Sequence, residues 1–190
     1  MLKLVAVLKK ELKTFLCSPV ALVFFGAYLL ATLFSFFWVE KFFSRNLADV
    51  RPLFEWMPVI MIFLASAITM RMWSEERRTG TIELLMTSSV EIWELVLGKF
   101  FACLFIIGLA LAFTMILPFT VNFVAELDWG PVVGGYVATL FLAAGYLAVG
   151  LYVSSRSESQ IESLILSSLI CGFFYILGTD TVTSFFGAEL

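Results

Sequence analysis

The chain has 190 residues, of which 61% are hydrophobic and only 14% charged, and its net charge is −3. Soluble domains carry roughly a quarter charged residues, so this composition excludes an ordinary water-soluble fold. An acidic chain also lacks the clustered basic surface that a nucleic-acid partner requires. We therefore predict an all-α, polytopic membrane protein with a single domain, residues 1–190, embedded in membrane lipids.

Metal and cofactor sites are not expected in this chain. The sequence contains no histidine, and Cys17, Cys103 and Cys171 lie far apart, without the paired spacing of a zinc site. We interpret these cysteines as small apolar residues.

Residues 1–16 predict an amphipathic helix on the membrane surface. Apolar residues recur at helical spacing on one face, and Lys9, Lys10 and Lys13 lie on another. Ser18-Pro19 is expected to end this helix, because proline disfavours helical geometry in the residue before it. The lysines also exclude a cleavable signal peptide, whose apolar core would be uninterrupted.

Five apolar segments follow, each long enough to be a transmembrane helix. We expect these spans at residues 20–39, 57–73, 100–125, 131–153 and 161–177. The polar residues 40–55 predict a loop or a short surface helix, with Pro58 in the first turn of the second span. The third span is long enough to tilt or kink, and Pro118 lies within it.

The fourth span carries small residues on one face. Gly135, Thr139 and Ala143 are spaced by four positions, so they share a side of the helix. Small residues in this arrangement favour close contact with a neighbouring helix.

The distribution of lysine and arginine between the connections predicts the orientation. The N-terminal side carries Lys3, Lys9, Lys10, Lys13, Arg71, Arg77, Arg78, Lys99 and Arg156. The other side carries only Lys41, Arg45 and Arg51. We therefore expect the N-terminus to be cytoplasmic.

Residues 74–99 form the most informative connection. Gly80 can end a first short helix, and Thr81 is a plausible N-cap for a second one. A connection of this length with a half-apolar helix at its tip offers a surface to a soluble partner. By its chemistry alone, the segment is equally consistent with an ordinary solvated loop.

This segment resembles the signature region of the type-two ABC transporter permeases, the ABC-2 type membrane subunits. The matching positions are Glu75, Glu76, Arg77, Gly80, Thr81, Glu83, Leu84, Leu85, Gly98 and Lys99. The N-terminal Lys10-Glu11-Leu12 and Ser18-Pro19 match as well, which adds Glu11 to the charged residues of the surface helix. In detail the chain is similar to the gliding-motility-associated branch of this family, known chiefly from bacteria.

The chain departs from the family pattern at two points. Relatives often have a proline where this chain has Ser88-Ser89. The family usually has six spans, so the resemblance implies a sixth span beyond Leu190.

The resemblance implies a permease subunit of an ATP-driven exporter in the bacterial inner membrane. ATP and Mg would bind a separate cytoplasmic ATPase, and a second permease copy or a related permease would complete the path. In this interpretation Glu75, Glu76, Arg77, Arg78 and Glu83 would contact the ATPase or the surface helix, and Leu84 and Leu85 would fill a groove in the ATPase. The chain has no phosphate-binding loop of its own, because Gly98-Lys99 lacks the glycine five residues earlier and is followed by Phe100.

Polar residues inside the spans are the candidates for lining a substrate path, because their burial in lipid costs free energy. These candidates are Ser66, Thr69, Thr114 and Asn122. Hydroxyl groups can instead bond back to their own helix. No ionisable residue is expected in mid-span, which argues against a proton- or sodium-coupled carrier.

Two other functions are consistent with the composition. The chain could be a membrane scaffold or anchor subunit of a larger bacterial machine that moves no solute. An intramembrane enzyme is disfavoured, because the sequence has neither histidine nor an acidic pair in mid-span to perform chemistry.

Overall fold

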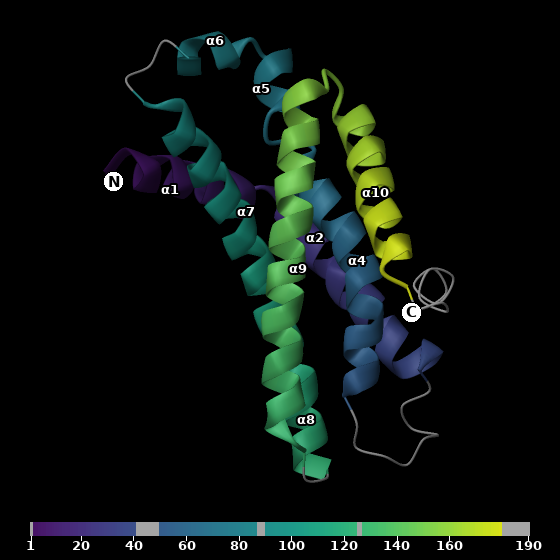
Figure 1. The fold of residues 1–190 in the computed structure, drawn as a ribbon. Helices are drawn as coiled ribbons and strands as arrows, with labels where there is room; N and C mark the ends of the chain where they lie inside the picture. The colour runs from purple at the N-terminus through teal and green to yellow at the C-terminus, as the bar shows by residue number, and fades with distance from the viewer. Residues whose placement is uncertain (1, 41–49, 87–89, 125–126, 180–190) are drawn as a thin grey trace, which may run out of the picture.

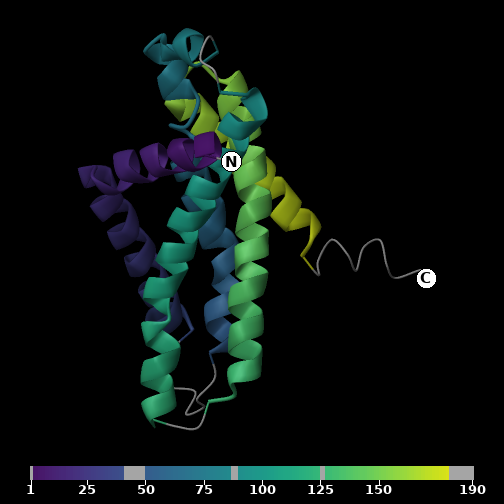
Figure 2. The ribbon, with the colours of Figure 1, turned by 90° about the vertical axis from the view of Figure 1, so that its left-hand side faces the viewer.

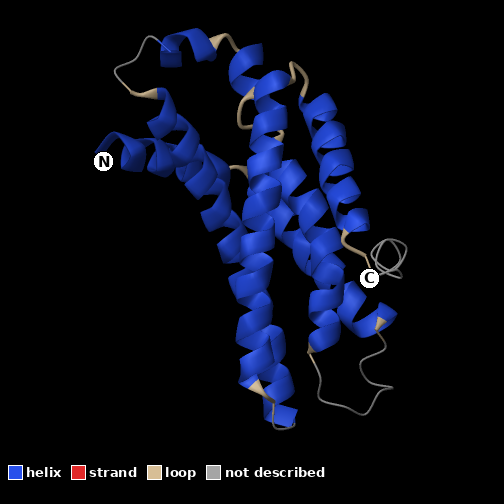
Figure 3. Cartoon of the chain, viewed as in Figure 1, coloured by secondary structure: helices blue, strands red, loops and turns tan. Residues whose placement is uncertain are grey.

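The computed structural model of the chain is a bundle of α-helices, which Figure 1 shows in chain order. It describes residues 2–40, 50–86, 90–124 and 127–179. Figure 3 shows helices joined by short turns and no strand in these ranges, so the all-α prediction is confirmed. Five of the described helices are long and apolar enough to cross a membrane, as predicted. The expected sixth span would lie beyond Leu190, outside the described residues, and stays a prediction.

The first helix, α1 (Leu2–Leu16), lies across the ends of the long helices, roughly perpendicular to them (Figures 1 and 2). Lys9, Lys10 and Lys13 are exposed, whereas Leu12 and Phe15 are partly buried and pack against the core. This separation of faces agrees with the predicted amphipathic helix.

The first span is continuous but changes its helical geometry. Ser18 caps the N-terminus of α2 (Pro19–Phe34), where its Oγ accepts a hydrogen bond of 3.2 Å from the amide of Val20. The helix then continues as the π-helical turn η1 (Ser35–Val39). Together the two segments occupy the predicted span at residues 20–39.

The second span begins earlier than the sequence predicted. Helix α4 (Arg51–Thr69) starts at Arg51, so the assignment of 51–55 to a polar connection is wrong. Arg51 and Glu55 are exposed while Leu53 and Met57 are buried, so these charges lie on the outer side of a helix. Residues 41–49 lie outside the described part of the chain.

Pro58 was expected in the first turn of that span, and this too is wrong. Pro52 is the proline near the start of α4, a position where a missing N–H costs nothing. Pro58 lies inside the helix. Its lack of an N–H leaves one carbonyl of α4 without its usual donor.

The third span is divided into α7 (Ile92–Thr114) and α8 (Ile116–Val124). The break at Met115 precedes Pro118, consistent with the predicted kink. Helix α7 starts at Ile92 and not near Phe100, so the last part of the predicted connection 74–99 is helical. Glu91 and Glu94 form a capping box at this start.

The fourth span, α9 (Trp129–Arg156), packs closely against α4. A Cβ atom added to Gly135 would lie 2.7 Å from the ring of Phe54, and Thr139 and Ala143 are buried on the same face. The close contact predicted for this face is confirmed. The last described helix, α10 (Gln160–Leu177), packs against both α4 and α9.

Candidate functional site

The connection between the second and third spans extends beyond the bundle, at the end where α1 lies (Figures 1 and 2). It contains two short helices, α5 (Ser74–Arg78) and α6 (Thr81–Met86). Gly80 separates them with a φ of 70°, a left-handed conformation that favours glycine. The predicted break at Gly80 is confirmed, although Thr81 is the first residue of α6 and not the residue before it.

The side chain of Ser154 in α9 holds the turn between α4 and α5. The amide of Trp73 donates a 3.2 Å hydrogen bond to Ser154 Oγ. Ser154 Oγ also lies 3.5 Å from the carbonyl oxygen of Met70, and Ser74 Oγ donates to that same carbonyl. These contacts are buried, so the connection is attached to the bundle at its base.

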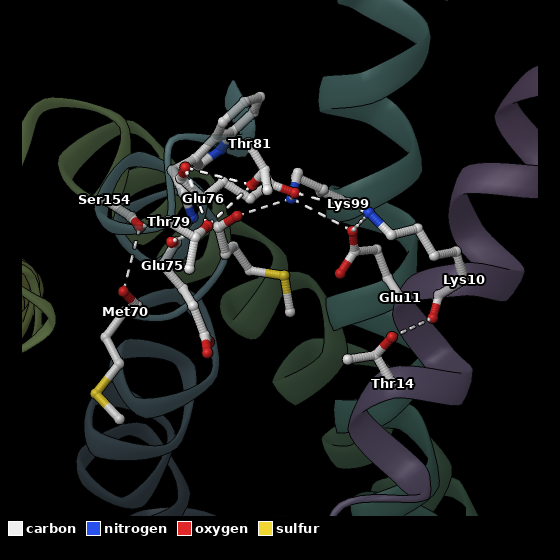
Figure 4. Close-up of polar contacts among 12 residues, drawn as sticks. Lys10, Glu11, Thr14, Met70, Glu75, Glu76, Thr79, Thr81, Lys99 and Ser154 are labelled. Carbon is white, nitrogen blue, oxygen red and sulfur yellow. Dashed lines mark hydrogen bonds and ion pairs between the residues drawn. The ribbon is translucent and has the colours of Figure 1, made fainter. Parts of the chain in front are cut away.

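Lys99 is the centre of the charged group that joins three helices (Figure 4). Its ammonium Nζ lies 2.8 Å from Glu76 Oε1 of α5, 3.4 Å from Glu11 Oε1 of α1 and 2.7 Å from the carbonyl oxygen of Met72. The Trp73 ring centroid lies 4.9 Å away, within cation–π distance. We call Glu11, Glu76 and Lys99 the charged junction.

The geometry of the charged junction satisfies the buried ammonium. Lys99 is 1% exposed, and an ammonium has three N–H donors for which the structure supplies three oxygen acceptors. A buried charge is tolerated when it is paired and hydrogen-bonded in this way. The junction therefore links α5 to α1 and α7 by contacts that are costly to break.

Gly98, next to Lys99, allows α1 to approach α7. A Cβ atom at Gly98 would lie 2.8 Å from Val7 Cγ1 of α1, which is closer than real side chains pack. The Gly98-Lys99 pair thus has two separate roles: glycine permits the crossing of α1 over α7, and lysine forms the ion pairs beside it.

The remaining predicted contact residues divide into two sets. Glu75 forms a 3.2 Å ion pair with Arg71, four residues earlier. Arg77 and Arg78 of α5 and Glu83 of α6 are exposed. The side chains of Leu84 and Leu85 lie outside the described part, although their backbone belongs to α6. Contacts of Arg77, Arg78, Glu83, Leu84 and Leu85 with an ATPase stay a prediction.

The predicted path residues are not brought together. Thr69 ends α4 and its hydroxyl donates to the Ala65 carbonyl at 2.8 Å, whereas Thr114 ends α7 and lies 3.1 Å from the Tyr136 hydroxyl. Asn122 is exposed on α8 and accepts a 3.4 Å hydrogen bond from the Leu127 amide. Ser66 is buried between helices. Their lining of a path in an assembled transporter stays a prediction.

Three members of the site were not predicted: the Met72 carbonyl, Trp73 and Ser154. The Met72 carbonyl is a backbone group, and nothing in the residue type reveals that it faces Lys99. Trp73 could have been noticed as an aromatic residue directly before a charged stretch. Ser154 could have been noticed as a hydroxyl at the end of an apolar span.

The fold and the charged junction define a multi-pass α-helical membrane protein with a structured connection between its second and third spans. Residues 46–186, about three quarters of the chain, match the family described as ABC-2 family transporter protein. The chain belongs to this family, whose members are membrane subunits without an ATPase site and generally work with a cytoplasmic ATPase. No curated protein and no solved structure matches it significantly.

Proposed function

We propose that this chain is the membrane-spanning permease subunit of an ATP-driven ABC exporter, and that residues 74–99 couple it to a separate ATPase. The observation that carries this proposal is the charged junction. It ties the exposed connection to α1 and α7, so a force on the connection has a direct route to the spans. Membership of the ABC-2 family supports the proposal.

The proposed coupling uses the exposed side chains of residues 74–99 to contact the ATPase and the buried ones to hold the spans. The side chains of Arg77, Arg78 and Glu83 are exposed, whereas Glu76 is bound to Lys99. When the ATPase closes on ATP and Mg, it would press on α6. Because α5 is held by α7 through Lys99 and by α9 through Ser154, the displacement would be passed to these spans rather than absorbed by the loop.

The distribution of lysine and arginine along the bundle supports a cytoplasmic partner. The charged junction, α5 and the arginine that ends α9 all lie at the same end of the bundle (Figure 1). An excess of lysine and arginine marks the cytoplasmic side. We therefore propose a cytoplasmic N-terminus in the inner membrane of a bacterium, where the connection would meet the ATPase.

A second permease, either another copy or a related chain, would complete the path. Many large apolar side chains of the spans face outward, and lipid or a second permease could cover them. Within the family, the resemblance to the gliding-motility-associated branch stays part of this proposal.

Site-specific photo-crosslinking in native membranes tests the function. A cross-linker at Glu83, exposed on α6, should capture a nucleotide-binding protein. The control is Glu55, exposed on α4 at the opposite end of the bundle, which should not capture it. Capture of a partner without nucleotide-binding activity at Glu83 would instead favour the scaffold or anchor function.

A further inference from the structure

A cleft of about 420 Å³ opens beside the charged junction, between α1, the end of α4 and α5. Its polar wall includes Lys10 and Arg71 as cations and Glu75 as an anion. Its apolar part includes Phe15 and Ile68. A site with charges on one side and apolar side chains on another suits an amphipathic ligand.

The position of the cleft along the bundle places it where the spans end. Ser18 lines it and directly precedes the first residue of α2, and Ile68 is the last residue but one of α4. The surface helix α1 forms one wall. A cleft at this level faces the boundary between hydrocarbon and headgroups, where phospholipid is the most abundant amphipathic molecule.

The charges of the cleft favour a ligand that carries both signs. Its lining contains Lys10, Arg71 and Lys99 against Glu11, Glu75 and Glu76, so the formal charges cancel. The junction itself has one lysine for two carboxylates, and Lys10 Nζ, 3.8 and 4.0 Å from those carboxylates, offsets the remaining negative charge. Lys10, Arg71 and Glu75 remain partly exposed, with side chains that are 60%, 33% and 40% accessible.

The Lys10 ammonium and the Ser18 hydroxyl can each donate a hydrogen bond to a phosphate in the cleft. The carboxylate oxygens nearest to Lys10 Nζ lie at 3.8 and 4.0 Å, beyond hydrogen-bond distance. Ser18 Oγ accepts from the Val20 amide, which leaves its own proton to donate.

We propose that this cleft binds the headgroup of a zwitterionic phospholipid with a primary ammonium group, of the phosphatidylethanolamine type. The phosphate would lie against Lys10, Arg71 and the Ser18 hydroxyl, and the ammonium would donate to Glu75. Glu75 is now paired with Arg71 at 3.2 Å, so turning Arg71 toward the phosphate would leave Glu75 in need of a new cation. The primary ammonium would replace it, whereas a choline headgroup has no N–H to donate and a glycerol headgroup carries no cation. The acyl chains would continue from Phe15 and Ile68 along the outside of the spans.

This site is independent of the proposed ATPase coupling, so it is tested on the purified full chain without a partner. The chain would be equilibrated in mixed micelles that contain equal mole fractions of phosphatidylethanolamine, phosphatidylcholine and phosphatidylglycerol. Native mass spectrometry would then count the retained lipids. We expect phosphatidylethanolamine to be retained about two- to fivefold more than either of the others, the range that one partly exposed charge pair can supply.

Matched variants locate the binding. Lys10→Gln should lower the number of retained lipids, because Lys10 faces the phosphate that all three share. Lys9→Gln should leave retention unchanged, because Lys9 is exposed on the same helix and does not line the cleft. Glu75→Gln should shift retention toward phosphatidylglycerol, and Glu158→Gln, exposed in the turn before α10, should not. Equal thermal unfolding of the Lys9 and Lys10 variants shows that folding is unaffected.

Three results would overturn the proposal. The first is equal retention of the three lipids, and the second is unchanged lipid retention in Lys10→Gln together with an unchanged preference in Glu75→Gln. The third is complete displacement of the lipid by an equal concentration of water-soluble glycerophosphoethanolamine, which would show that the acyl chains contribute nothing and that the ligand is a free phosphate compound.

Discussion

Lys99 of α7 and Glu76 of α5 are 23 positions apart in the sequence, yet their charged atoms lie 2.8 Å apart in the interior of the protein. Glu11 of α1, 88 positions before Lys99, completes the pairing. One buried ammonium group therefore joins α1, α5 and α7, which hydropathy alone treats as separate elements.

Replacing Lys99 by Met should destabilise the protein by about 3 kcal/mol, because the mostly buried carboxylates of Glu11 and Glu76 lose their nearest cation and keep only Lys10, at 3.8 and 4.0 Å. Thermal unfolding of the purified chain in detergent measures the loss. Lys9→Met, on the exposed face of α1, is the control and should change little. The triple variant with Glu11→Gln and Glu76→Gln should recover part of the stability, and an unchanged unfolding temperature in Lys99→Met would show that the junction is not stabilising.

Replacing Gly98 by Ala should loosen the contact between α1 and α7. The new Cβ would meet Val7, so we expect a loss of about 1–3 kcal/mol, as in other overpacked contacts. Gly108→Ala on the same helix is the matched control, because nothing lies within 4 Å of that Cβ position. Adding Val7→Ala should restore the stability of Gly98→Ala, and failure to do so would place the strain elsewhere.

Two adjacent glycines in α9 give a similar test of the contact with α4. Gly135→Ala should cost about 1–3 kcal/mol because its Cβ would overlap the ring of Phe54. Gly134→Ala should be neutral or slightly stabilising, since its Cβ meets nothing within 4 Å and alanine favours a helix. Unfolding temperatures of the two variants should therefore differ, and equal values would contradict this packing.

Gly80→Ala should weaken the turn between α5 and α6 by about 1–2 kcal/mol, because alanine is strained at positive φ. Nothing lies within 4 Å of the new Cβ, so the effect should come from the backbone alone. Gly80→Asn should cost less, since asparagine tolerates this conformation. Faster amide hydrogen exchange in α5 and α6 of the alanine variant measures the effect, and equal exchange in both variants would exclude a backbone cause.

Glu83→Lys tests the proposed coupling. Reversing an exposed charge at an interface should weaken association with the ATPase by about tenfold, the effect of placing like charges together. ATP hydrolysis by the reconstituted complex, measured with and without the permease variant, reports the coupling. Glu158→Lys changes the same charge at another exposed position and should leave stimulation intact. Unchanged hydrolysis with Glu83→Lys would remove this residue from the coupling surface.

The sequence by itself determined the elements that depend on neighbouring residues. Five apolar segments predicted five long helices because hydropathy accumulates over consecutive positions, and Gly80 predicted a break because its conformational freedom is local. The face that carries Gly135 was also predictable, since helical spacing alone brings Gly135, Thr139 and Ala143 to one side.

Only the tertiary structure decided which charges are exposed and which are buried. Arg51 and Glu55 looked like a loop until packing showed that Leu53 and Met57 fill the other side of the same helix. Lys99 looked like the end of a connection, yet it is buried because Glu11, Glu76 and the Met72 carbonyl converge on it. Such pairing depends on distances between segments far apart in sequence, and those distances exist only once α1 has crossed α7 at Gly98.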